Sequence, residues 1–114
     1  MGVNLKIGVT ITATPQIDRI LRYAALSYRA VMGPDFEVVV TAGSDGHHGE
    51  HSMHYKNLAV DLRTGHSWSP PLMTPQEARD IRDELTLRLG AGYDVVLEGD
   101  HIHAEYDPKV PAAA

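Results

Sequence analysis

Two helix patterns, each framed by its own start and stop signals, constrain this chain most. Thr14-Pro15 and Thr74-Pro75 each place a capping residue before a proline at the first helical position. Gly33-Pro34 ends the first helix and Gly90 ends the second. The apolar positions recur every three or four residues, as on one face of a helix. They are Ile17, Ile20, Leu21, Ala24, Tyr28 and Val31 in the first helix, and Ala78, Ile81, Leu85 and Leu89 in the second.

Short strand patterns fill most of the remaining chain. The β-branched run 36–41 predicts a buried strand, and alternation over 58–63 predicts another, in which Asp61 projects away from the main apolar set. Segments 94–98 and 101–106 predict a hairpin. Ahead of the first helix the pattern fits either a strand or a loop. This order predicts an α+β fold in which two helices pack on a small, mainly antiparallel sheet.

Length and charge narrow the class of protein. The chain has 114 residues, so we expect one domain over 1–114, with 110–114 as a frayed tail. The formal net charge is -5 and no basic cluster is present, which argues against nucleic acid as a partner. No apolar run approaches the roughly 20 residues of a membrane span, and the N-terminus lacks the pattern of a secretion signal. We therefore expect a protein that is made in the cytoplasm and has no membrane partner. We also expect a monomer.

Histidine is the unusual feature of the composition. The chain has no cysteine, so any metal would need histidine nitrogen and carboxylate oxygen as ligands. Six of the seven histidines fall into two clusters, which are His47, His48, His51 and His54, then His101 and His103. The last two share a face of one predicted strand because side chains there alternate. On spacing alone, a metal site and solvated surface histidines are about equally favoured.

Two motifs at these residues resemble a known family. Segment 52–63, Ser-Met-His-Tyr-Lys-Asn-Leu-Ala-Val-Asp-Leu-Arg, is similar to Ser-x-His-x-x-Gly-x-Ala-x-Asp. Segment 100–106, Asp-His-Ile-His-Ala-Glu-Tyr, is similar to Asp/Glu-x-x-His. With a helix between them, they resemble the zinc D-Ala-D-Ala carboxypeptidases and L-alanyl-D-glutamate endopeptidases of bacteria and phages. The resemblance covers 39–108.

The resemblance implies a role for each matching residue. The implied zinc ligands are His54, Asp61 and His103. Asp100 would be the carboxylate that activates water, and His101 would orient the substrate or stabilise charge in the transition state. A second frame is open, because Glu98-Gly99-Asp100-His101 also spells Glu-x-x-His. In that frame Glu98 is the base and His101, rather than His103, is a ligand.

The chain departs from the family pattern at the substrate side. Asn57 stands where the family has glycine. This change is tolerable because Asn is the non-glycine residue that adopts a positive φ most readily. Many members carry an arginine ahead of the first histidine to bind the substrate, whereas 33–53 contains neither arginine nor lysine. We expect Arg63 and Ser52 as substrate contacts. The other candidates are His47, His48 and His51, for which a polar loop at the rim of the site is the favoured interpretation, and His66 and Trp68, which fit loop anchors equally well.

The implied activity is zinc-dependent hydrolysis of an amide bond in peptidoglycan stem peptides. A missing upstream arginine weakens a carboxylate clamp and favours an L-alanyl-D-glutamate endopeptidase, similar to a phage or prophage endolysin. Two alternatives stay open: a D-Ala-D-Ala carboxypeptidase, and an inactive metal-binding module of a virion or cell wall. Retention of Asp100 argues against the inactive module, because a structural zinc normally fills its fourth position with protein.

Overall fold

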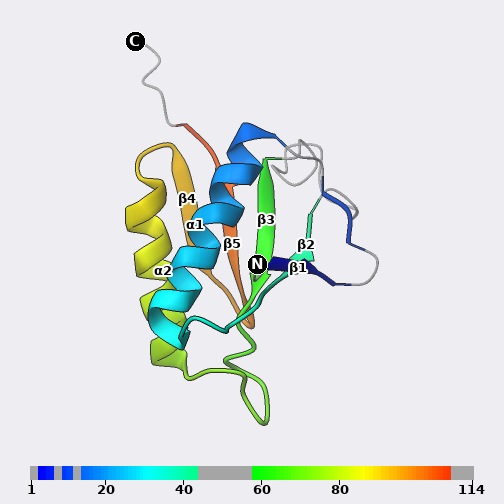
Figure 1. Ribbon diagram of the computed structural model, residues 1–114, viewed down its shortest axis with the longest axis vertical. Coiled ribbons are helices and arrows are strands. Elements are labelled where there is room, and N and C mark those ends of the chain that lie inside the picture. Colours follow the sequence, from blue (N-terminus) through cyan, green and yellow to red (C-terminus); the bar gives the residue numbers. More distant parts are fainter. Residues whose placement is uncertain (1–2, 7–8, 12–13, 44–57, 109–114) are drawn as a thin grey trace.

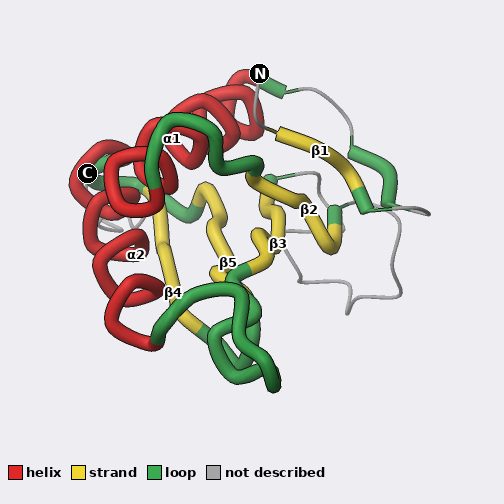
Figure 2. The backbone as a smooth tube through the Cα atoms, turned by 60° about the horizontal axis from the view of Figure 1, so that its bottom comes forward, coloured by secondary structure: helices red, strands yellow, loops and turns green. Residues whose placement is uncertain are grey.

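Five strands form one sheet, and two helices cover one of its faces (Figures 1 and 2). The computed structural model describes residues 3–6, 9–11, 14–43 and 58–108. In chain order the elements are β1 (Val3–Leu5), α1 (Pro15–Met32), β2 (Val38–Ala42), β3 (Ala59–Arg63), α2 (Pro75–Leu89), β4 (Tyr93–Leu97) and β5 (His101–Tyr106). The strand order is β1-β2-β3-β5-β4, with β1 parallel to β2 and all other pairs antiparallel. The predicted α+β class is confirmed.

Local capping explains why both helices begin where the sequence predicts. The Thr14 side chain accepts a hydrogen bond from the Ile17 backbone N–H, at the start of α1. At α2, Thr74 and Glu77 form a reciprocal capping box. Each helix ends at a glycine with positive φ, 107° at Gly33 and 76° at Gly90, where a side chain would strain the backbone. In the described part of the chain, no helix is long and apolar enough to cross a membrane.

The hydrophobic core lies between the helices and one face of the sheet. The predicted helical stripes supply Ile17, Ile20, Ala24, Tyr28, Ala78, Ile81, Leu85 and Leu89, all buried. Alternate residues of three strands meet them, namely Val38 and Val40, Val60 and Leu62, and Ile102 and Ala104. Because strand side chains alternate, the residues between these positions project from the opposite face. That opposite face carries Asp61, His101 and His103.

The strand ends differ from the sequence prediction by one or two residues. β2 begins at Val38 rather than 36, because the Phe36 backbone N–H bonds back to the Gly33 carbonyl at 3.3 Å and the Phe36 ring stacks on Tyr28. β4 runs from Tyr93 to Leu97, one residue earlier than predicted, and the backbone bond from Glu98 N–H to the His101 carbonyl closes the turn. β5 coincides with its predicted range.

A buried tyrosine ties the first helix to the end of β3. Tyr28 is fully buried, and its hydroxyl donates a hydrogen bond to the Arg63 carbonyl at 3.0 Å. Burial raises the pKa of this hydroxyl far above its usual range, so it stays a donor. The contact anchors the strand next to the histidine face.

We expect Tyr28→Phe to lower the free energy of unfolding by about 1 kcal/mol, the net worth of a typical buried hydrogen bond. Urea denaturation measures it. Tyr23→Phe is the matched control, because Tyr23 lies on the same helix and its hydroxyl makes no hydrogen bond to the described residues. Equal stability of the two variants would contradict the anchoring role.

Candidate metal and catalytic site

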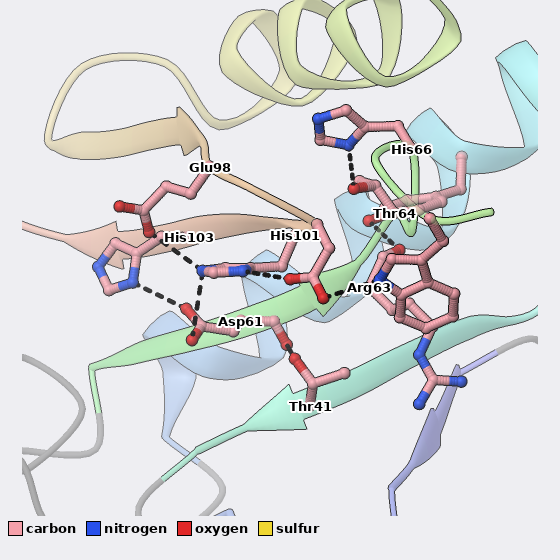
Figure 3. Close-up of polar contacts among 11 residues, drawn as sticks. Thr41, Asp61, Arg63, Thr64, His66, Glu98, His101 and His103 are labelled. Carbon is pink, nitrogen blue, oxygen red and sulfur yellow. Dashed lines mark hydrogen bonds and ion pairs between the residues drawn. The ribbon is translucent and has the colours of Figure 1, made fainter. Parts of the chain in front are cut away.

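The pairing of β3 with β5 builds the candidate site. In this register Asp61 lies directly opposite His103, and Arg63 lies opposite His101. All four side chains project from the face opposite the helices, because Val60, Leu62, Ile102 and Ala104 between and beside them are buried in the core. Figure 3 shows the Asp61 carboxylate between the two histidine rings.

His103 is held between two carboxylates. Its Nδ1 lies 2.9 Å from Asp61 Oδ1, and its Nε2 lies 2.7 Å from Glu105 Oε1. The side chains of His103 and Asp61 are 20% and 18% exposed, so water screens the contact only partly. The hydrogen bond to Asp61, with a smaller contribution from the hydrogen bond to Glu105, outweighs burial and raises the pKa of His103 to about 9.

His101 contacts three carboxylates. Its Nδ1 is 3.0 Å from Asp100 Oδ1, while its Nε2 is 3.1 Å from Glu98 Oε1 and 3.7 Å from Asp61 Oδ2. Burial alone would lower the pKa of His101, but the hydrogen bond to Asp100 and the charges of Asp61 and Glu98 raise it overall. Asp61 and Glu98 therefore share one ring nitrogen, and Asp100 takes the other.

The cluster is anionic in every protonation state of its histidines. Its acids are Asp61, Glu98, Asp100 and Glu105, against two imidazoles. Even when both rings carry a proton, carboxylates outnumber them two to one. Such a cluster attracts a cation, and a metal ion would replace the protons that the rings share with the acids.

Asp100 is held from three directions. Its carboxylate accepts hydrogen bonds from Trp68 Nε1 at 2.9 Å and from the His101 ring. These two bonds, His101 first, lower the pKa of Asp100. Its backbone carbonyl accepts the N–H groups of Thr64 and Gly65, at 2.8 and 2.9 Å. Asp100 is thus an ionised, oriented carboxylate at the end of the site.

Arg63 lies next to Trp68, the residue that bonds Asp100. Its guanidinium carbon is 5.5 Å from the centre of the Trp68 ring, a cation–π contact. Its Nε is buried without an acceptor, and Arg63 forms no ion pair with the residues that the structure describes. The group is an anion-binding candidate on the same strand face as Asp61.

The structure brings together five of the predicted site residues, Asp61, Glu98, Asp100, His101 and His103, with Arg63 beside them. Ser52, His54 and the cluster at 47–51 lie outside the described residues. His66 Nδ1 is 2.6 Å from the hydroxyl of buried Thr64, so His66 is bound to its own loop. This contact favours the loop-anchor interpretation of His66.

Sequence reasoning missed one contributor to the site, Glu105, and one contact of Trp68, which it had named only as a loop anchor or a substrate contact. Glu105 shares the strand face of His103 by its i+2 spacing, which alternation alone could have shown. Trp68 reaches Asp100 across 32 positions of sequence, and no local signal marks that contact.

A second acidic group was also not predicted. Ligand oxygens of Asp94, Glu105 and Asp107 lie within 4.8 Å of one another. Asp94 faces Glu105 in the β4–β5 register, so the hairpin explains their proximity. Exposed acids often gather without a metal, and Glu105 is already bonded to His103.

The residues present fit zinc. An imidazole nitrogen and a carboxylate oxygen are the donors that zinc takes where cysteine is absent, and here one of each lies in contact across two strands. Glu105 on the far nitrogen of His103 is the outer partner that zinc-binding histidines usually have. The third implied ligand, His54, lies outside the described residues.

Two comparisons with known proteins add no relative. A scan against protein-family models and a search of curated proteins each found no match for the chain. The family resemblance therefore stays a prediction from the two sequence motifs.

Proposed function

We propose that this protein is a zinc-dependent peptidase that hydrolyses peptidoglycan stem peptides. The observation that carries the proposal is the 2.9 Å contact between Asp61 and His103, the two implied ligands within the described residues. They are 42 positions apart in sequence and come from different motifs. The acids beside them supply candidate bases, which a purely structural metal would not need.

The residues divide the work between metal binding and proton transfer. When bound, Zn²⁺ polarises the scissile carbonyl and makes a water molecule acidic enough to lose a proton near neutral pH. Asp61 and His103, with His54, would hold the ion. Asp100 accepts the proton of the attacking water and delivers it to the leaving amine, and His101 orients Asp100 by bonding to its Oδ1.

Glu98 is the alternative base. It bonds the same nitrogen of His101 that faces Asp61, whereas Asp100 bonds the opposite nitrogen. Glu98 therefore lies on the Asp61 side of the ring, which supports the frame with His101 as a ligand. The closer approach of His103 to Asp61, 2.9 Å against 3.7 Å, supports the frame with Asp100 as the base. We keep Asp100 as the leading assignment.

Arg63 is the residue that we expect to bind the substrate. Its guanidinium lacks an anionic partner among the described residues and shares a strand face with Asp61, two residues away or roughly 7 Å. The free α-carboxylate of D-glutamate, whose side-chain carboxyl is bonded to the next residue of the stem peptide, is a suitable partner. We therefore favour cleavage between L-Ala and D-Glu by an endolysin-like enzyme, of phage or prophage origin, that acts on the cell wall.

Zinc binding is the first test. We expect purified protein to hold close to one zinc ion per chain, and Asp61→Ala or His103→Ala to abolish this. Glu105→Gln removes only an outer partner of His103 and should weaken zinc binding by roughly 10- to 100-fold. Isothermal titration calorimetry and elemental analysis measure both effects.

His66→Ala is the matched control for the zinc experiment, because His66 bonds Thr64 and contacts none of the acids. If His101→Ala abolishes zinc binding while His103→Ala does not, the second frame is correct. Zinc binding that survives both changes would contradict the site.

Hydrolysis is the second test. We expect the protein to cleave muropeptides, and Asp100→Ala to lower kcat by at least the roughly hundredfold typical of losing a general base, with zinc still bound. Mass spectrometry of the digested muropeptides measures the rate and names the bond. Glu98→Ala should be much less impaired.

An inactive Glu98→Ala beside an active Asp100→Ala would transfer the role of base to Glu98. Release of D-alanine from pentapeptides would instead identify a D-Ala-D-Ala carboxypeptidase. A protein that binds zinc and cleaves nothing would be the inactive metal-binding module.

Arg63→Ala is the third test. We expect this change to raise KM on stem peptides by roughly tenfold with little change in kcat, because a ground-state ion pair would be lost. Arg82→Ala is the control, since Arg82 pairs only with its neighbour Asp83 on α2. A KM unchanged by Arg63→Ala, on substrate that wild type cleaves, would show that Arg63 does not bind the peptide.

A further inference from the structure

Trp68 lies between the candidate base, Asp100, and the candidate substrate-binding residue, Arg63. It lies in the loop that joins β3 to α2, and the residue is 40% exposed. Its indole N–H donates to Asp100 Oδ2 at 2.9 Å, and its ring face receives the Arg63 guanidinium. One side chain thus contacts both the candidate base and the candidate substrate-binding cation.

The loop around Trp68 is built to hold the indole in this place. The backbone N–H of Trp68 donates to the Gly65 carbonyl at 3.2 Å, and the backbone N–H of Leu72 donates to the same carbonyl at 3.2 Å. Gly65 has φ +57°, and a Cβ there would lie 2.8 Å from the Leu72 side chain and 3.0 Å from the Trp68 ring. The loop therefore closes tightly over a glycine that leaves room for both side chains.

The contact to Asp100 is not needed to hold the neighbouring backbone. The Thr64 and Gly65 N–H groups already bond the Asp100 carbonyl, so the start of β5 is fixed to the end of β3 without the indole. The indole adds a hydrogen bond to Oδ2 of the carboxylate, beside the one that His101 makes to Oδ1, and the two bonds together fix its orientation. A hydrogen bond to an ionised carboxylate is short and strong, and it restricts the rotation of a side chain that is otherwise partly exposed.

We propose that Trp68 is a positioning residue for the hydrolytic reaction: its indole N–H orients the Asp100 carboxylate, and its ring face holds the Arg63 guanidinium toward the peptide. The inference rests on the proposed peptidase function. It assigns the two contacts to different kinetic constants, because Asp100 acts in the chemical step and Arg63 in substrate binding.

Trp68→Phe separates the two contacts. Phenylalanine keeps an aromatic face for Arg63 and lacks the N–H. We expect kcat to fall by roughly tenfold while KM stays within about twofold of wild type. Trp68→Leu removes both contacts, so kcat should fall and KM should rise. Leu72→Ala is the matched control, because Leu72 packs in the same loop over Gly65, and both constants should stay near wild type.

Replacing only the indole N–H separates positioning from packing. Trp68 is the only tryptophan of the chain, so biosynthetic replacement of tryptophan by benzothienylalanine changes this position alone. Sulfur replaces the N–H while ring shape and π face are kept. This protein should reproduce the kcat defect of Trp68→Phe with an unchanged KM. A kcat equal to wild type would overturn the positioning role.

A measurement independent of activity tests the contact itself. The single indole N–H gives one resolved signal in a ¹⁵N-labelled NMR spectrum. Asp100→Ala should move its proton signal upfield and speed its exchange with solvent, because the bond to the carboxylate is lost. Leu72→Ala should leave the signal close to its wild-type position.

The two readouts separate the failure of this inference from the failure of the proposed function. If wild type cleaves muropeptides but the indole signal ignores Asp100→Ala, Trp68 does not position Asp100. If the signal moves and no form of the protein cleaves a stem peptide, the peptidase function is wrong and the positioning role falls with it. Equal kinetic effects of Trp68→Phe and Leu72→Ala would also overturn the inference, because they would reflect packing of the loop.

Discussion

The antiparallel pairing of β3 with β5 is the constraint on which the site depends. It places Asp61 opposite His103 and Arg63 opposite His101, and it leaves Val60, Leu62, Ile102 and Ala104 in the core. A slip of one residue would bury the acid and histidines and expose the apolar side chains, so the hydrophobic core enforces the register of the polar face. Tyr28 reinforces it by bonding the Arg63 carbonyl. The same packing that stabilises the fold therefore sets the geometry of the candidate metal site.

Electrostatics then gives this face its chemical character. Each histidine lies between carboxylates, so both rings are held in place and their pKa values are raised. Such a cluster is costly unless a cation or a proton balances its acids, and a zinc ion would supply that balance while using the same donor atoms. At the far end of the cluster, Trp68 hydrogen-bonds Asp100 and its ring contacts the Arg63 guanidinium, which is the proposed substrate-binding group.

Local signals predicted the local structure well. Both helices begin and end at the residues marked by Thr-Pro and Gly, because caps act within a few positions of sequence. The alternation of apolar residues correctly predicted that Asp61 projects away from the core. Local signals could not predict three features. These are the pairing of the three-residue strand β1 with β2, the choice of β5 as the partner of β3, and the bond from Trp68 to Asp100. Each depends on contacts between segments far apart in sequence. The zinc and peptidase assignments depend on the two motifs and on the geometry that joins them.

Anomalous diffraction at the zinc absorption edge, from crystals of the zinc-loaded protein, tests the central claim most directly. The account predicts one strong anomalous peak between the Asp61 carboxylate and Nδ1 of His103, with Glu105 still bonded to the far nitrogen of that ring. A peak bound to His101 instead of His103 would move the site to the second frame. A peak at Asp94, Glu105 and Asp107, or the absence of any peak near Asp61, would contradict the account.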